Sequence, residues 1–340
     1  MTGPQDYGQL GADRVQAVTL VNAAGLRARL ITYGARLTEL QVPDRDGRID
    51  DIVLGCDTLA GYVASTAYFG ATCGRYGNRI AGGQIVIDGA DWQLDRNEGI
   101  NHLHGGSVGF DRKIWAIDRL GPAEVSFVAV SQDGEMGYPG QCELRCTYAL
   151  TDDNRLRITM EATTTRATVM NMVNHSYFNL AGHGSGDVLG QLVQIAAQHY
   201  TPVDASLLAT GEVAPVVGTE FDFTRPRPIG TAFEHGYDHN WCLDDSGGQR
   251  PGVEVLDPGS GRRLRLTSSE PGLQFYTGGY LHAEMTGKGA QSLCRFAGFT
   301  LETQKYPGSP NHAQFPSAIL RPGQRYRHWM ELAFSTDAQP

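Results

Sequence analysis

Six short segments of the chain carry more polar and aromatic side chains than an ordinary β-strand needs. They combine guanidinium, imidazole, amide and carboxyl groups with glycines, which let backbone approach a ligand closely. The segments are residues 74–80 (GRYGNRI), 101–106 (NHLHGG), 172–180 (MVNHSYFNL), 236–241 (GYDHNW), 272–278 (GLQFYTG) and 299–305 (FTLETQK). Planar polar groups bind vicinal hydroxyls and aromatic rings cover apolar C–H faces, so the combination favours a sugar site. The candidate aromatic partners are Tyr76, Tyr177, Phe178, Trp241, Phe275 and Tyr276.

Most of these side chains also have a purely structural interpretation. Arg75 and Arg79 are each compatible with a surface ion pair, and Asp238 with a turn that follows Gly236. At strand spacing His102 and His104 point to the same face, and either one alone is more often a structural histidine than a catalytic one.

Glu302 is harder to interpret as structural. Phe299 and Leu301 lie on the opposite face of the same expected strand, so the carboxyl group occupies either an ordinary solvent-facing position or a functional one. The residues alone leave both readings open.

The elements that must position these groups are strands. Short apolar or alternating runs are separated by turn residues, as at Asp88-Gly89 between residues 85–87 and 92–94, and at residues 257–261 (DPGSG). Helical periodicity is confined to residues 58–64, behind Asp57 as N-cap, and one turn at 309–313. The pattern predicts a single all-β domain over residues 1–340, a large antiparallel β-sandwich with few short helices.

The composition argues against some classes of binding partner. The net charge is −9 and no run of basic residues stands out, so neither a nucleic acid nor an anionic membrane is an expected partner. The first residues lack a basic start and an apolar region, so we expect no secretory signal, and no apolar run is long enough to span a bilayer. The six scattered cysteines form no CxxC pair, which predicts free thiols in a reducing, cytoplasmic compartment.

Two kinds of cofactor site are not expected. The histidines lie far apart in sequence and there is no HExxH, so no metal site is predicted. The glycines at 182, 184 and 186 do not form GxGxxG between a strand and a helix, so no nucleotide site is predicted either. We therefore expect a small-molecule substrate and no cofactor.

Taken together, the ordered motifs resemble those of the aldose 1-epimerase (galactose mutarotase) family. The resemblance covers nearly the whole chain, and seven motifs matched in order make it very specific. They are residues 33–35 (YGA), 70–81 (GATCGRYGNRIA), 103–106 (LHGG), 174–182 (NHSYFNLAG), 200–204 (YTPVD), 236–240 (GYDHN) and 315–323 (FPSAILRPG).

The resemblance implies a mutarotase-type β-sandwich with its active site in an open cleft on one sheet. It implies that His175 is the catalytic acid and Glu302 the catalytic base, acting without a cofactor on a free monosaccharide in a monomer or homodimer. The implied substrate contacts are Asn78, Arg79, His104, Tyr177, Asp238 and Gln274. Gly77 stands where alanine is common in the family, and Gly279-Tyr280 where Asn-Phe is usual; we expect both departures to touch the cleft rim.

The implied reaction opens a cyclic hemiacetal and recloses it on the other face. A base takes the proton of the anomeric hydroxyl while an acid protonates the ring oxygen, and the two groups then exchange roles. A carboxylate is ionised at neutral pH without tuning. An imidazole is only partly protonated there, so we expect Asp238 or Glu302 to raise the pKa of His175. His104 is the alternative acid.

Three other functions fit parts of the pattern. A glycoside hydrolase would use Asp238 and Glu302 as its carboxyl pair. A non-catalytic sugar-binding protein would not need an acid–base pair. A hexose-phosphate 1-epimerase would need basic residues at the rim, for which Arg225 and Arg227 are candidates, although their sequence (TRPRP) reads better as a turn.

Overall fold

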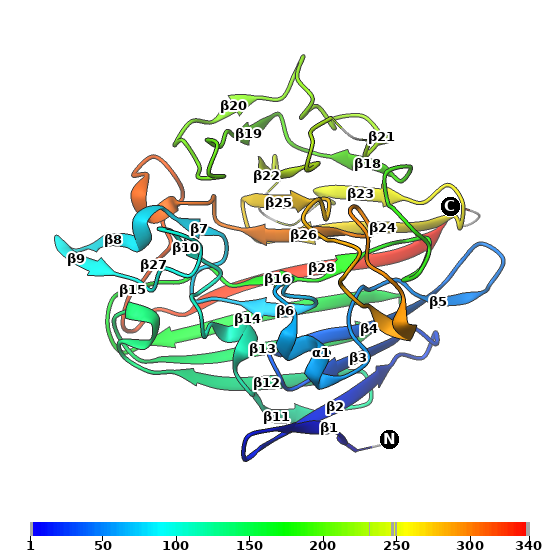
Figure 1. Ribbon diagram of the computed structural model, residues 1–340, viewed down its shortest axis with the longest axis horizontal. Helices are drawn as coiled ribbons and strands as arrows, with labels where there is room; N and C mark the ends of the chain where they lie inside the picture. Colours follow the sequence, from blue (N-terminus) through cyan, green and yellow to red (C-terminus); the bar gives the residue numbers. More distant parts are fainter. Residues whose placement is uncertain (1–2, 231, 246–247, 249, 338–340) are drawn as a thin grey trace.

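Antiparallel strands dominate the computed structural model, which describes residues 3–230, 232–245, 248 and 250–337 (Figure 1). The largest sheet has nine strands, in the order β11 (Ala116–Leu120), β12 (Glu124–Ser131), β13 (Cys142–Thr151), β14 (Arg155–Thr164), β28 (Tyr326–Thr336), β24 (Arg262–Ser268), β23 (Val253–Leu256), β18 (Leu192–Ile195) and β21 (Arg227–Pro228). A six-stranded sheet has the order β17 (Tyr177–Phe178), β26 (Phe299–Gln304), β25 (Gly272–Tyr276), β22 (Asp238–Cys242), β19 (His199–Thr201) and β20 (Ala214–Pro215).

Smaller elements surround these two sheets. A five-stranded sheet runs in chain order through β1 (Gln5–Leu10), β2 (Asp13–Val21), β3 (Arg27–Ile31), β4 (Arg36–Pro43) and β5 (Ile49–Asp51). Two-stranded ribbons pair β6 (Ala71–Cys73) with β16 (Val173–His175), β7 (Arg79–Ile80) with β10 (His102–Leu103), β8 (Gln84–Ile87) with β9 (Ala90–Gln93), and β15 (Thr168–Val169) with β27 (Ile319–Leu320). The helical elements are α1 (Leu59–Ala64) and the 3₁₀ turns η1 (Ala81–Gly83), η2 (Phe110–Arg112), η3 (Glu135–Gly137), η4 (Lys288–Ala290) and η5 (Ser309–Asn311).

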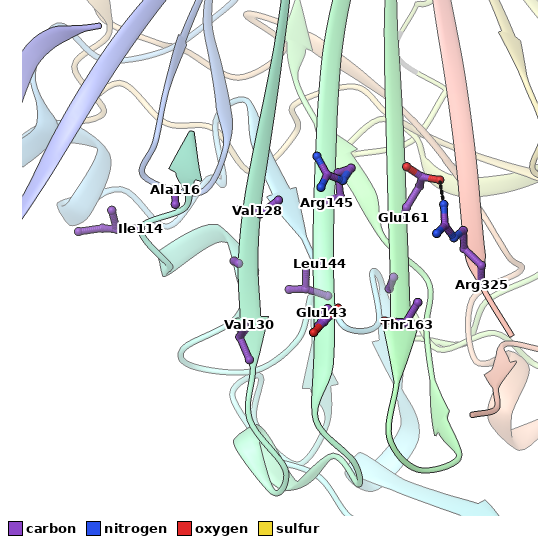
Figure 2. Close-up of a pocket in the computed structure, with 12 residues that line it drawn as sticks. Ile114, Ala116, Val128, Val130, Glu143, Leu144, Arg145, Glu161, Thr163 and Arg325 are labelled. Atoms are coloured by element: carbon purple, nitrogen blue, oxygen red, sulfur yellow. Dashed lines mark hydrogen bonds and ion pairs between the residues drawn. The ribbon is translucent and has the colours of Figure 1, made fainter. Parts of the chain in front are cut away.

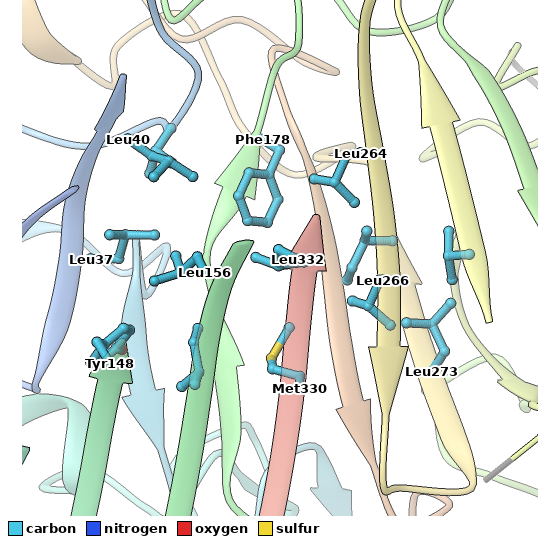
Figure 3. Close-up of a cluster of buried hydrophobic side chains, with 14 of the residues drawn as sticks. Leu37, Leu40, Tyr148, Leu156, Phe178, Leu264, Leu266, Leu273, Met330 and Leu332 are labelled. Carbon is cyan, nitrogen blue, oxygen red and sulfur yellow. The ribbon is translucent and has the colours of Figure 1, made fainter. Parts of the chain in front are cut away.

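The core lies between the sheets, because each long strand buries every second side chain. Along β14 the buried residues begin at Leu156 and recur with period two, and β28 buries Met330 and Leu332 in the same way. Figure 3 shows these side chains filling the interior beside Leu264 from β24 and Phe178 from β17. Each such side chain contributes about 1.5–3 kcal/mol when it leaves water.

The six-stranded sheet differs because β26 buries both of its faces. Phe299 and Leu301 face the core, as the sequence predicts. Thr300, Glu302 and Gln304 form the other face, which is also covered and carries polar groups where a surface strand would meet water. Buried polar groups cost free energy unless they are hydrogen-bonded, so the partners of this face need to be identified.

The local predictions are largely confirmed. The turns at Asp88-Gly89 and at residues 257–261 connect β8 to β9 and β23 to β24. Helix α1 forms, but its N-cap is Thr58 instead of Asp57, because the Thr58 hydroxyl accepts the Gly61 N–H. All six cysteines are free. Within the described ranges no helix has the length and apolar composition of a membrane span.

Candidate active site

One pocket of about 190 Å³ brings together all eight residues that the resemblance implied. It lies on the polar face of the six-stranded sheet, with walls from the ribbons β6–β16 and β7–β10. Its volume is below the roughly 300–1,000 Å³ that is usual for drug-sized ligands, which suits one sugar ring. The eight residues are Asn78, Arg79, His104, His175, Tyr177, Asp238, Gln274 and Glu302.

Glu302 lies at the floor of this pocket with only 2% of its surface exposed. The Thr300 hydroxyl donates to its Oε1 at 2.9 Å, and no described residue hydrogen-bonds Oε2. Burial raises the pKa of the Glu302 carboxyl to about 8; the Thr300 hydrogen bond opposes this shift and the charge of Asp238 adds to it. The expectation that Glu302 is ionised at neutral pH without tuning is therefore wrong, because burial shifts the pKa of its carboxyl to the neutral range.

His175 enters the pocket from β16, and its Nε2 lies 3.6 Å from Oε1 of Glu302. Burial lowers the pKa of its imidazole to about 4, and the weaker pull of Asp238 in the other direction does not compensate. The predicted raised pKa is therefore wrong. The loss of water around the imidazole lowers its pKa by more than the nearby negative charge raises it.

His175 and Glu302 therefore form a pair that shares one proton. Between the two pKa values of about 4 and about 8 the pair holds a single proton, and the higher of the two values belongs to the carboxyl. Moving that proton to the imidazole gives the carboxylate base and imidazolium acid without a change of net charge.

His104 is held as a neutral hydrogen-bond donor. Its Nδ1 accepts the backbone N–H of Asn78 at 3.2 Å, so its proton must be on Nε2. Burial is the largest cause that holds the pKa of this imidazole well below its ordinary value, and His175 adds to it. The loop reaches Asn78 because Gly105 has φ +96°, and a Cβ there would lie 1.8 Å from the Gly74 carbonyl oxygen.

His102 does not share the face of His104, contrary to the strand-spacing prediction. The strand β10 ends at Leu103 and His104 takes a left-handed φ of +51°, so the period of two is broken. The His102 ring instead contacts the Tyr138 hydroxyl at 2.5 Å and the Asp95 carbonyl at 2.6 Å. It is the structural histidine of the two.

One wall of the pocket is a charged network. Arg79 pairs with Glu98 at 2.8 Å and reaches Asp238 at 3.6 Å, while the Gln274 amide donates to Asp238 at 2.6 Å. Arg75 takes no part in it: its guanidinium is buried and donates to backbone and hydroxyl oxygens such as the Ser131 Oγ at 2.9 Å. Arg79 lines the pocket and Arg75 does not, so the preference for Arg79 as the substrate contact stays a prediction that this geometry allows.

Asn78 and Tyr177 complete the predicted set. Asn78 has a left-handed φ of +66°, and its Oδ1 accepts the Arg79 N–H at 2.8 Å, which fixes the turn that carries both residues. The Tyr177 ring lies 5.1 Å from the His175 ring, centroid to centroid.

Sequence reasoning missed some site residues and chose some wrong ones. Tyr68 lines the pocket and Glu98 holds Arg79, yet neither belongs to a segment that the sequence singled out. Among the candidate aromatic partners only Tyr177 and Tyr276 line the pocket. The others are core residues with 1% exposure or less: Tyr76, Phe178, Trp241 and Phe275.

A larger hollow of about 540 Å³ lies elsewhere, on the outer face of the nine-stranded sheet. Figure 2 shows its side chains projecting from β12, β13 and β14, with Glu161 paired to Arg325. It is lined by apolar residues and surface charges, with no histidine. Size alone is therefore a poor guide here, because the smaller pocket is the one lined by two histidines and the buried Glu302 carboxyl.

Three groups in the pocket approach one another closely enough to reach one ion. Single ligand atoms of His104, His175 and Glu302 lie within 4.8 Å of one another. However, a histidine that binds a metal donates its other ring N–H, whereas Nδ1 of His104 accepts one from Asn78. Its Nε2 is thus protonated, and the arrangement favours proton donation to a substrate.

Known proteins resemble this chain over most of its length. The family model described as aldose 1-epimerase matches residues 16–333. The chain belongs to the aldose 1-epimerase family. It is 43% identical to the galactose mutarotase of Rattus norvegicus over 91% of each chain. It is 36% identical to the aldose 1-epimerase of Escherichia coli (strain K12), covering 93% of this chain and 94% of that one.

Solved structures of this family share the fold. The GalM/aldose epimerase homologue from C. elegans superposes with a TM-score of 0.90 at 29% identity, covering 95% of this chain and 99% of that chain. The galactose 1-epimerase from Lactobacillus acidophilus gives a TM-score of 0.86 at 27% identity over 98% of each chain. The predicted all-β mutarotase-type fold is thus confirmed.

Gly77, a departure from the family pattern, lies behind the site and not at its rim. A Cβ at this position would lie 2.6 Å and 2.8 Å from the two Cγ atoms of Val173, which is two residues before His175. The alanine that is common in the family therefore does not fit beside this valine. Gly279 does lie near the rim, where a Cβ would be 1.7 Å from the His235 carbonyl oxygen, and Tyr280 lines the pocket.

We expect Gly77→Ala to lower the free energy of unfolding by about 1–3 kcal/mol, because the added methyl group overpacks the ribbon β6–β16. Denaturant unfolding measures the change. In a Val173→Ala background the same substitution should cost much less, since the clashing methyl groups are gone. An equal cost in both backgrounds would show that the crowding has another source.

Proposed function

We propose that this chain interconverts the α and β anomers of free aldoses, with Glu302 and His175 as the acid–base pair. The observation that carries the proposal is a buried histidine–carboxyl pair, 3.6 Å apart, in a pocket the size of one sugar ring. The family to which the chain belongs is named for this reaction.

Substrate binding prepares the pair for catalysis. A sugar hydroxyl that hydrogen-bonds the Glu302 carboxyl stabilises its charged form, so the shared proton moves to His175. Glu302 then accepts the proton of the anomeric hydroxyl while His175 protonates the ring oxygen, and the C1–O5 bond breaks to give the open-chain aldehyde.

Ring closure reverses these steps on the other face. After rotation about C1–C2, His175 removes the proton from the O5 hydroxyl as O5 attacks C1, and Glu302 returns a proton to the aldehyde oxygen. The pair again holds one proton at the end. His104 donates its Nε2–H to a sugar oxygen, and Arg79, Asp238 and Gln274 orient the remaining hydroxyls.

The buried pair argues against a function of binding alone. Binding alone does not need a basic and an acidic group side by side, whereas a proton-transfer reaction does, and His175 and Glu302 lie 3.6 Å apart. A phosphorylated substrate is not supported either. Arg225 and Arg227 do not line the pocket, and Arg227 pairs with Glu220.

The test is NMR exchange spectroscopy on an equilibrated aldose such as galactose. We expect the enzyme to add magnetisation exchange between the α and β anomeric proton resonances, and to leave an aryl galactoside intact. Release of the aryl alcohol would instead support the glycoside hydrolase that uses Asp238 and Glu302. No added exchange with any aldose would contradict the proposal.

We also propose a monosaccharide substrate, a monomer or homodimer, and a cytoplasmic location. All eight implied site residues come from one chain, so the site does not require a partner subunit. Six free cysteines, five of them buried, are typical of a reducing compartment. Sedimentation equilibrium and cell fractionation would test the last two points.

A further inference from the structure

Tyr68 stands in a backbone conformation that its side chain disfavours. It lies in the turn between α1 and β6 with φ +56°, in the left-handed region that glycine adopts at far lower cost. Strained residues of this kind cluster at functional sites. The strain is a reason to ask what the tyrosine ring does that glycine could not.

The turn around Tyr68 is tied to the site on both sides. The Tyr68 carbonyl accepts the Ala71 N–H at 2.9 Å, and the Phe69 carbonyl accepts the Arg36 guanidinium at 2.8 Å. The Gly70 N–H donates to the carbonyl of His175 at 3.0 Å. These bonds fix the backbone from which the Tyr68 ring projects relative to the histidine.

The ring itself contacts both histidines of the pocket. Its centroid lies 4.8 Å from the His104 ring and 5.5 Å from the His175 ring, and those two rings are 5.1 Å apart. No described residue hydrogen-bonds the Tyr68 hydroxyl. Three rings face the His175 imidazole, those of Tyr68, His104 and Tyr177. The carboxyl of Glu302 faces it as well. The charges of Asp238 and Arg36 act on it from farther away.

We propose that Tyr68 is a positioning residue whose ring holds the imidazoles of His104 and His175 in place for proton transfer to the sugar. This inference rests on the proposed function. The tyrosine fills the space beside both rings, so that neither can rotate away from the substrate and water cannot replace the ring contacts. On this view, the strained backbone of Tyr68 is the cost of placing an aromatic ring beside the two histidines.

Tyr68→Gly is the informative substitution, because it removes the ring and relieves the strained φ at the same time. We expect a folded protein with kcat for anomer interconversion lowered about 10²-fold, the scale of losses from a misplacement of about 1 Å. Tyr68→Phe keeps the ring and should stay close to wild type. Leu207→Gly is the matched control, since Leu207 also has a left-handed φ of +59° but does not line the pocket.

A second measurement does not depend on activity. NMR titration of the histidine ring protons should show the pKa of His175 rising from about 4 toward its ordinary 6.5 in Tyr68→Gly, because water reaches the imidazole. The acid limb of the kcat/KM profile should move to higher pH with it. A merely structural role would lower the melting temperature without moving either.

The outcomes separate this proposal from the proposed function. Wild-type activity in Tyr68→Gly, or an unchanged His175 titration, would overturn the positioning role. An equal loss of activity in Tyr68→Phe would show that the hydroxyl and not the ring is needed, which would also overturn the proposal. If Tyr68→Gly does not fold, Tyr68→Asn, which tolerates the same backbone, takes its place. A wild-type enzyme without activity on any aldose would defeat the proposed function alone, because the titration still tests the ring contacts.

Discussion

Replacing Glu302 by glutamine is expected to lower kcat for anomer interconversion by about 10²–10⁴-fold, the usual contribution of one general acid–base group. The amide has nearly the same shape and can still accept the Thr300 hydroxyl, but it cannot take a proton from the anomeric hydroxyl. KM should change little, because the groups proposed to orient the sugar hydroxyls remain. Polarimetry at several sugar concentrations separates the two parameters.

Stability and a surface control distinguish lost chemistry from lost structure. Folding raises the pKa of Glu302 from 4.5 to about 8, so the carboxyl stabilises the fold fully below pH 4.5, and this stability is lost as the pH rises through 8. Glutamine has no such dependence, so the melting temperature of Glu302→Gln at pH 8 should not fall below that of wild type. Glu161→Gln, on the outer sheet face, should keep full activity. Retention of more than about a tenth of kcat in Glu302→Gln would contradict the assigned base.

The second large effect is on the pH profile of kcat/KM, which is expected to be a broad bell with limbs near pH 4 and pH 8. Below about 4 the pair gains a second proton and has no base, and above about 8 it loses its only proton and has no acid. Each limb should fall about tenfold per pH unit, so activity at pH 10 is roughly 10²-fold below the plateau.

The width of the bell shows whether the pKa values of Glu302 and His175 are shifted by burial. If both groups titrated at their ordinary values of about 4.5 and 6.5, the plateau would be narrow and activity at pH 7.5 would already be falling. Initial rates must be corrected for spontaneous mutarotation in the same buffer. A narrow bell would show that the pair is more hydrated than its burial implies, and a profile with no upper limb up to pH 9 would contradict the value of about 8 for the upper limb.

The sequence pattern predicts the strands well, but it does not predict which segments cover the faces of the six-stranded sheet. The alternation along β14 and the turn at Asp88-Gly89 are local, and the structure follows them. The burial of both faces of β26 comes from ribbons that are distant in sequence, so the strand pattern could not distinguish a solvent-facing Glu302 from a buried one. The pKa predictions for Glu302 and His175 were wrong for the same reason.

Some further residues of the pocket could have been assigned or excluded from the sequence, and others could not. Phe275 lies between Gln274 and Tyr276, so the period of two already places it on the other face of β25 and in the core. Tyr68 gave no such signal, because its left-handed backbone and its contacts with two histidines arise from tertiary packing. Motif resemblance located all eight implied residues, and it said nothing of the groups that support them, such as Glu98.

Polarimetry of freshly dissolved α-galactose and α-glucose, with wild type, Glu302→Gln and His175→Asn side by side, tests the central claim most directly. We predict that wild type brings at least one of these sugars to its equilibrium rotation far faster than buffer does. Each substitution should bring the rate close to that of buffer. Rotation that relaxes at the buffer rate with every enzyme, or equally fast with all three, would contradict the account.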